Sequence, residues 1–364
     1  MDTIFDYIKW RGDLSFPEKD FCEADGMLFA MASYINYAKR TGGAEMTLSE
    51  CAKGYCAGGK YESESIGLIF PTKQINRSFC EMAASRRFGR AKVTDFVDKT
   101  SVEDGYQFSA VTFHVSKKMM VVSFRGTDDS IVGWREDCCM AFMDEIPSQR
   151  MAVEYIESLA AKYPEKKMIL TGHSKGGNLA MYSTVKCSRD AFDRIVRAYS
   201  FDGPGLTRST VESDEFKAAE KKLTVILPQS SMVGIMFAKG EKYHVVESRA
   251  KGVLQHDPYT WVLEGPQFVK LSELSSRGKK NEDTFRRRMD NMSGAEKKSL
   301  VESLFGIVEA TGARTLTDFS KAGPKNVITL AKTYGGLDKE QRELIQLLLF
   351  KLLEIKSAVA QENG

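Results

Sequence analysis

The sequence predicts an α/β fold with a mostly parallel central sheet flanked by helices. In the middle third of the chain, short apolar runs typical of strands alternate with segments of helical periodicity, which indicates parallel strands covered on both faces. Ahead of them, an alternating segment, a turn and a continuous apolar run indicate two more strands. The expected strands are 107–114, 119–124, 167–171, 195–201, 223–227 and 243–247, and the helices among them are 151–163 and 178–185.

Each element has its own signal. Apolar and polar residues alternate from Gln107, and the Ser116-Lys117-Lys118 turn leads into the continuous apolar run 119–124. The helix 151–163 presents an apolar residue at every fourth position and stops at Pro164, because proline cannot continue a helix.

The length of 364 residues fits one catalytic domain with helical additions. We expect a mostly helical N-terminal segment over 1–100 that packs on the core and includes a helix across 27–37. The catalytic core is expected over 101–265 and a helical extension over 266–364. In that extension, Ser293-x-x-Glu296 and Asp338-x-x-Gln341 resemble capping boxes ahead of amphipathic helices. Those helices need a partner surface, so we expect them to pack on the core or to mediate self-association.

Composition excludes several classes of function. The 52 basic and 49 acidic residues nearly cancel, which gives no support for nucleic-acid binding. We find neither an apolar run of transmembrane length nor a secretion signal at the N-terminus. The seven cysteines include no C-x-x-C pair, which favours reduced thiols and a cytoplasmic protein. No cluster of histidines, cysteines and carboxylates suggests a metal, and we expect no cofactor.

The strongest motif is Gly172-His173-Ser174-Lys175-Gly176, which lies between an expected strand and an expected helix. In this context G-x-S-x-G forms a tight turn that lifts the serine oxygen above the sheet, while the glycines allow the strand and the helix to approach closely. The motif therefore predicts an α/β-hydrolase fold with Ser174 as the nucleophile. The alternative is a glycine-rich turn in an inert relative.

A second motif, Phe124-Arg125-Gly126-Thr127, ends an apolar strand upstream of the serine. Acyl transfer develops an oxyanion that needs two preorganised N–H donors. We expect these donors to be the backbone N–H groups of Thr127 and Lys175. The alternative is that Arg125-Gly126-Thr127 is an ordinary polar turn.

Together with Trp134 and Asp137, these two motifs resemble the class 3 lipases, and the chain resembles a poorly characterised bacterial branch of lipase-like α/β hydrolases. The similarity runs from about Gln107 to Trp261. It implies that the segment 129–139, with Trp134, is a lid over the site. The alternative is that Trp134 is an ordinary core residue.

A serine nucleophile also needs an imidazole base, and the chain has four histidines. His114 and His244 lie in expected strands, and His173 lies inside the serine turn, where it is expected to pack or to orient the turn. His256 follows the expected strand 243–247 in a loop, which is where this fold places its base. We therefore predict His256, and the resemblance implies the same residue.

The acid is predicted to be Asp202, which follows the strand 195–201 and precedes Gly203-Pro204-Gly205. Class 3 lipases place the acid after the next strand, but the matching stretch 227–232 has no carboxylate. The alternatives are that Asp202 caps its own turn, or that a Ser-His dyad is helped by Ser231. Asp257, adjacent to His256, is badly placed to orient it.

These residues predict a serine hydrolase that uses a Ser-His-Asp triad and an acyl-enzyme. The resemblance implies a carboxylic ester substrate, such as an acylglycerol or phospholipid. Alternatives on the same triad are a thioesterase, a peptidase or an acyltransferase. A further alternative is a non-catalytic lipase-fold module that binds a lipid or a protein.

Overall fold

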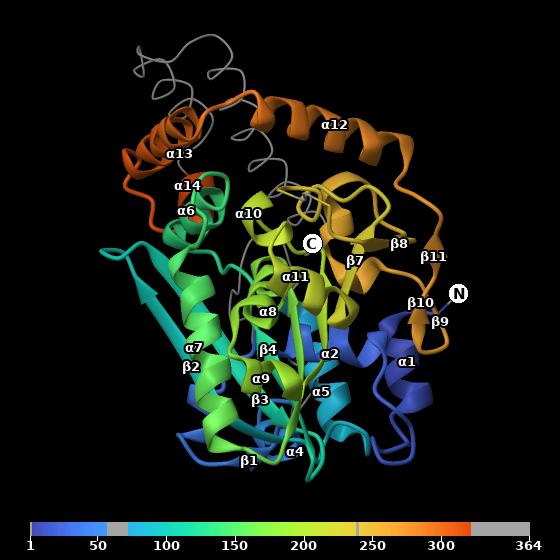
Figure 1. The fold of residues 1–364 in the computed structure, drawn as a ribbon. Helices are drawn as coiled ribbons and strands as arrows, with labels where there is room; N and C mark the ends of the chain where they lie inside the picture. The colour runs from blue at the N-terminus through green and yellow to red at the C-terminus, as the bar shows by residue number, and fades with distance from the viewer. Residues whose placement is uncertain (1, 57–71, 238–239, 322–364) are drawn as a thin grey trace.

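The computed structural model describes residues 2–56, 72–237 and 240–321 of the chain. These residues form an α/β fold in which helices cover both faces of a large central sheet (Figure 1). Within the described residues the sheet has nine strands in the order β1-β2-β3-β4-β5-β6-β7-β8-β11. A separate two-stranded sheet pairs β9 with β10.

The central strands β4 to β8 are parallel, and the strands at both sides of them are antiparallel. The carboxyl ends of the parallel strands therefore meet at one edge of the sheet, where ligands bind in open α/β folds. The strands are β1 (Met46–Thr47), β2 (Lys92–Ser101), β3 (Tyr106–His114), β4 (Met119–Phe124), β5 (Lys167–His173), β6 (Ile195–Phe201), β7 (Leu223–Pro228), β8 (Tyr243–Val246), β9 (Leu263–Glu264), β10 (Gln267–Phe268) and β11 (Lys270–Leu271).

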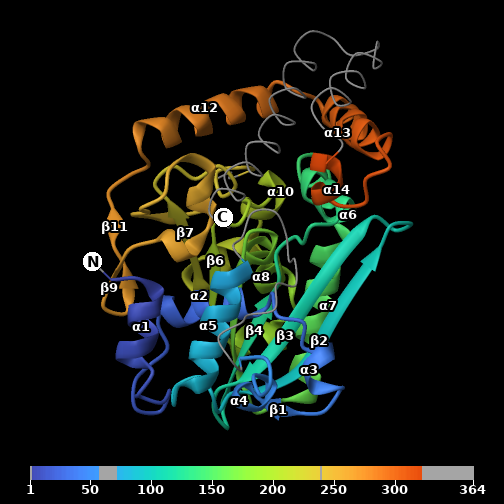
Figure 2. The ribbon, with the colours of Figure 1, turned by 180° about the vertical axis from the view of Figure 1, so that it is seen from behind.

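One face of the sheet carries α7, α8, α9 and α11, and the other carries α1, α2 and α5 (Figures 1 and 2). Helices α6, α12, α13 and α14 lie at the end of the molecule where β4 leads into α6 (Figure 1). The helices are α1 (Ile4–Arg11), α2 (Glu23–Ala32), α3 (Ala38–Thr41), α4 (Leu48–Cys51), α5 (Thr72–Ala84), α6 (Ile131–Cys139), α7 (Pro147–Lys162), α8 (Lys175–Lys186), α9 (Arg189–Arg194), α10 (Arg208–Val211), α11 (Asp214–Ala219), α12 (Ser276–Asp290), α13 (Gly294–Glu309) and α14 (Leu316–Lys321).

All six strands expected from the sequence are present, with bounds within two residues of those expected. The expectation of a mostly helical segment over the first hundred residues named no strand there, whereas the structure has β1 and β2. The alternation of β2 is broken by a register shift between Thr94 and Val97, where Asp95 adopts a φ of 52°. A bulge of this kind removes the period of two that identifies a strand in a sequence.

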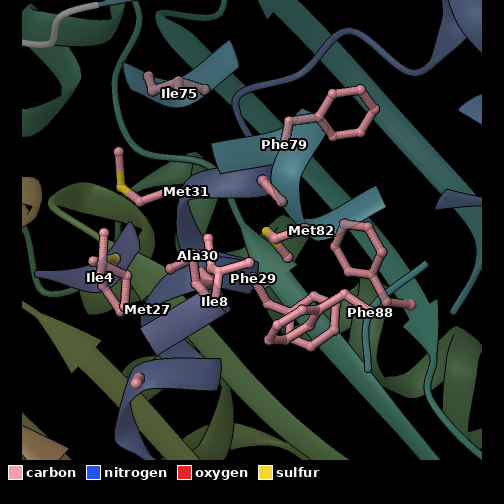
Figure 3. Close-up of a cluster of buried hydrophobic side chains, with 14 of the residues drawn as sticks. Ile4, Ile8, Met27, Phe29, Ala30, Met31, Ile75, Phe79, Met82 and Phe88 are labelled. Carbon is pink, nitrogen blue, oxygen red and sulfur yellow. The ribbon is translucent and has the colours of Figure 1, made fainter. Parts of the chain in front are cut away.

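The N-terminal helices share a large apolar core with the sheet (Figure 3). Ile4 and Ile8 of α1, Met27 and Met31 of α2 and Phe79 of α5 are among its buried members. Nearly every residue of α2 is buried, as expected for a helix that is apolar on all sides beyond its first turn. This helix ends at Ala32, so the helix expected over 27–37 is shorter at its C-terminal end and begins earlier.

Within this core, the Asp25 carboxylate of α2 pairs with the guanidinium of Arg87 at 2.6 Å, and neither side chain is exposed. The Tyr7 hydroxyl also donates to Asp25. The buried carboxylate is therefore paired with a buried cation and further hydrogen-bonded, which offsets the desolvation that an unpaired charge would suffer there.

In the C-terminal part, the capping box at Ser293 and Glu296 is confirmed at the start of α13. The apolar face of α13, with Leu300, Leu304 and Phe305, packs with Ile131 of α6 in a separate cluster. The second capping box, Asp338-x-x-Gln341, lies outside the described residues.

The expectation that all cysteines are reduced is wrong for one pair, because Cys56 and Cys80 form a disulfide. The sequence does not predict this disulfide, because the spacing of two distant cysteines does not show whether the fold brings them close enough to bond. Within the described ranges, we find no helix with the length and apolar character needed to cross a bilayer.

Candidate functional site

The turn between β5 and α8 has the geometry of a nucleophile elbow. Ser174 adopts a φ of 55° and a ψ of −133°, a conformation that L-residues rarely take. A Cβ on Gly172 would lie 2.1 Å from the Gly176 carbonyl oxygen, and one on Gly176 would lie 2.1 Å from that of Phe124. The glycines are thus required by close backbone contacts. The Ser174 side chain stays partly exposed, while its neighbours in the turn are buried.

The next strand, β6, brings Asp202 to the same edge of the sheet. His173 and Phe201 are partners in the parallel β5–β6 ladder. Ser174 directly follows His173, and Asp202 directly follows Phe201. The Ser174 N–H donates to the Phe201 carbonyl at 3.0 Å. Asp202 also has a positive φ, 48°, and a Cβ added to the next residue, Gly203, would lie 2.8 Å from the Ser174 carbonyl oxygen.

The imidazole of His256 meets the Asp202 carboxylate. Nδ1 of His256 lies 2.6 Å from Oδ2 of Asp202, and the two side chains are 2% and 0% exposed. His256 belongs to the 3-10 helix Gly252–His256, which lies in the connection between β8 and β9. Its ring centroid is 4.4 Å from that of His173, the residue before Ser174. The structure therefore brings Asp202 and His256 together beside the serine turn.

The second oxygen of the Asp202 carboxylate is held by the loop after β7. Oδ1 accepts a hydrogen bond from the Ser231 hydroxyl at 2.5 Å and another from the Gly234 N–H at 3.1 Å. This loop is the stretch in which the class 3 pattern expects an acid. Here it supplies a hydroxyl and a backbone donor to the carboxylate that comes from the preceding strand.

His173 and Tyr34 support the loop that carries His256. His173 contacts this loop directly, and Tyr34 contacts the His173 ring. The His173 Nε2 lies 2.9 Å from the His256 carbonyl oxygen, and its Nδ1 lies 3.4 Å from the Tyr34 hydroxyl. Burial lowers the pKa of His173 well below its ordinary value, so the ring is neutral. Its position inside the elbow motif was the signal available in the sequence. Tyr34, after α2, had none.

The remaining two histidines lie elsewhere. His244 is exposed on β8, as expected for a sheet residue. His114 ends β3, where its Nε2 lies 2.9 Å from the Thr94 hydroxyl. Asp257, next to His256, uses its carboxylate to accept the Tyr259 N–H.

The loop after β4 lies against the elbow on its other side. A Cβ on Gly126, the residue before the expected oxyanion donor Thr127, would be 3.2 Å from the Ser174 Cβ. The Thr127 hydroxyl donates to Oδ2 of Asp137 at 2.5 Å. Burial raises the pKa of Asp137 to about 6, even though the nearby Lys175 ammonium lowers it. Lys175, the other expected donor, opens α8 and is fully buried.

Trp134 lies on α6 between the two motifs. Its indole N–H donates to the Asp128 carbonyl at 3.1 Å, and its ring packs partly buried against the α6–α13 cluster. Within the part of the chain that the structure describes, no group of three or more histidines, cysteines and carboxylates is arranged to hold a metal ion.

Comparison with protein families matches residues 82–306 to the family described as Mbeg1-like. The match covers more than half of the chain. The chain belongs to the Mbeg1-like family. All the site residues described above except Tyr34 lie within this Mbeg1-like region. Comparison with curated proteins finds no match.

Several solved structures similar to this Mbeg1-like chain are lipases. M37 lipase is 14% identical with a TM-score of 0.37, and the match covers 66% of this chain and 91% of that lipase. Lipase II from Rhizopus niveus is 12% identical with a TM-score of 0.35, covering 61% and 77%. Lip2 lipase from Yarrowia lipolytica is 12% identical with a TM-score of 0.35, covering 69% and 85%.

Proposed function

We propose that this protein is a serine hydrolase that cleaves carboxylic esters, with Ser174 as the nucleophile, His256 as the base and Asp202 as the acid. One observation carries the proposal: a buried carboxylate and a buried imidazole form a 2.6 Å hydrogen bond beside a serine in a strained strand-to-helix turn. Burial of a polar pair and backbone strain both cost stability, and such costs cluster at functional sites.

The roles follow from the chemistry of each group. Asp202 holds the His256 Nδ1–H, which leaves Nε2 as the atom that takes the proton of the Ser174 hydroxyl. Ser174 attacks the acyl carbon, the alcohol leaves with the proton returned by His256, and water activated by His256 hydrolyses the acyl-enzyme. The backbone N–H groups of Thr127 and Lys175 are proposed to hold the oxyanion.

The substrate class belongs to the same proposal. The resemblance of the two motifs to class 3 lipases supports an acyl ester, including a lipid ester, and Trp134 on α6 is proposed as part of the cover over the acyl site. A panel of p-nitrophenyl esters of rising chain length would separate an esterase, which prefers short chains, from a lipase.

A fluorophosphonate probe tests the catalytic proposal. We expect the wild type to be labelled and Ser174→Ala to remain unlabelled. His256→Ala is expected to lose esterase activity, and His244→Ala is the matched control because that ring is exposed on β8. No labelling of the folded wild type would instead favour a non-catalytic binding module. If His244→Ala lost activity and His256→Ala kept it, His244 and not His256 would be the base.

A further inference from the structure

The residue after the nucleophile carries a buried positive charge. Lys175 is the first residue of α8 and its side chain is not exposed. A cation at a helix N-terminus is opposed by the helix dipole, and burial adds a desolvation penalty. The ammonium donates to the Gln107 carbonyl at 2.7 Å and to Oε2 of Glu136 at 3.0 Å. This conformation therefore depends on a carboxylate supplied from outside α8.

Glu136 of α6 is fully occupied as an acceptor. Besides the ammonium, it accepts the N–H of Gln107 at 3.1 Å and the N–H of Ser148 at 2.9 Å, one on each oxygen. The Ser148 hydroxyl also donates to it at 2.6 Å. The side chain is 1% exposed, so water cannot replace any of these partners. One carboxylate thus joins the start of β3, the start of α7 and the elbow.

The neighbouring residue of α6 connects the same helix to the other expected oxyanion donor. Asp137 accepts the Thr127 hydroxyl at 2.5 Å through Oδ2, and its Oδ1 lies 3.7 Å from the Lys175 ammonium. Two consecutive acidic residues therefore hold the side chains of Thr127 and Lys175, whose backbone N–H groups are the proposed donors.

We infer that Glu136 is a positioning residue for the oxyanion hole. It fixes the Lys175 side chain, and through it the direction of the Lys175 N–H, without contacting substrate. If the ammonium lost Glu136, it would be drawn toward Oδ1 of Asp137, 3.7 Å away. A shift of that carboxylate would disturb its other oxygen, Oδ2, which accepts the Thr127 hydroxyl. This inference rests on the proposed function, because an oxyanion hole is required only for acyl transfer.

The test compares Glu136→Gln, Lys175→Met and the double variant in hydrolysis of a p-nitrophenyl ester. Both Glu136 oxygens accept hydrogen bonds. In either orientation, the NH₂ group of a Gln side chain would therefore face an N–H or ammonium group that now donates to Glu136, and one hydrogen bond would be lost. We expect Glu136→Gln to lower kcat roughly 10- to 100-fold with little change in KM, since donor geometry acts on the transition state. Phosphonylation of Ser174 by the fluorophosphonate is expected to slow by a similar factor.

The double variant separates positioning from stability. Removing the second charge of a buried ion pair often restores stability that removal of the first loses. With Lys175 replaced by Met, the Gln amide introduced at position 136 can also donate to the Gln107 carbonyl that the ammonium occupied. We therefore expect the urea midpoint of Glu136→Gln/Lys175→Met to recover toward the wild type while kcat stays low. Asp25→Asn is the matched control, because it also neutralises one carboxylate of a buried ion pair, with Arg87, and it contacts none of the proposed oxyanion donors. It is expected to lose stability and keep the kcat of the folded protein.

Two results would overturn the inference while leaving the proposed function intact: recovery of kcat together with stability in the double variant, or equal kcat in Glu136→Gln and Asp25→Asn. Absence of Ser174-dependent hydrolysis in the folded wild type would be a different failure. It would remove the proposed function, and the inference with it.

Discussion

Replacing Asp202 by Asn is expected to abolish most of the hydrolytic rate while the protein stays folded. Oδ1 of Asp202 receives two donors, the Ser231 hydroxyl and the Gly234 N–H. The amide oxygen of Asn is therefore expected to take this side, which turns the amide N–H₂ toward His256. Nδ1 of His256 must then accept a hydrogen bond, so the proton moves to Nε2 and the ring can no longer take the Ser174 proton.

The size of the effect follows from this tautomer change. An Asp-to-Asn replacement in a Ser-His-Asp triad lowers kcat by about 10⁴, which corresponds to about 5 kcal/mol in the activation barrier. We expect a loss of 10³ to 10⁴ here, measured as kcat on p-nitrophenyl acetate with circular dichroism as the check on folding. Ser231→Ala is the control: it removes one donor and leaves the carboxylate on His256, so its expected loss is below about tenfold. A folded Asp202→Asn protein within tenfold of wild-type kcat would refute the assignment of Asp202 and favour a Ser-His dyad.

Three further predictions concern stability. Because Ser174 is held at a φ of 55°, Ser174→Gly should be more stable than Ser174→Ala by about 1–2 kcal/mol in urea titrations, with both inactive; equal midpoints would argue against strain at the elbow. Gly176→Ala would place a Cβ 2.1 Å from the Phe124 carbonyl, so we expect a loss of about 2–4 kcal/mol or failure to fold, and a wild-type midpoint would contradict that contact. Burial lowers the pKa of His114 to about 4 from 6.5, so the unfolded chain binds the proton first as the pH falls, and stability present above pH 6.5 is lost toward pH 4. His114→Gln should lose less stability across this window, and an unchanged difference from wild type between pH 7 and pH 4.5 would exclude the effect.

Local sequence signals were sufficient for the parallel part of the sheet, because its buried strands are continuous apolar runs bounded by turns. They failed at β2, where the bulge beside Asp95 interrupts the alternation. They also failed for the disulfide between Cys56 and Cys80, because pairing of distant residues depends on tertiary packing that a single sequence does not encode in its spacing.

For the candidate site, the elbow motif located Ser174, and elimination among four histidines pointed to His256. The partnership of Asp202 with His256 followed from chain order and strand position, and the structure places the two side chains in contact. The supporting contacts could not be anticipated. No sequence pattern indicates that Tyr34 lies beside His173. Glu136 likewise belongs to no motif, and its contact with the Lys175 ammonium depends on the fold.

The paired ends of β5 and β6 determine how insertions and deletions should act on this protein. Since Ser174 and Asp202 are each the next residue after partners in one ladder, their separation in space depends on strand alignment and not on how many residues lie between them along the chain. Lengthening the surface connection through α9 should therefore leave both groups in place, whereas a single residue inserted within either strand should separate them. In related sequences, the proposed acid would therefore be found at the end of the matching strand, and a search at a fixed number of residues from the serine would miss it.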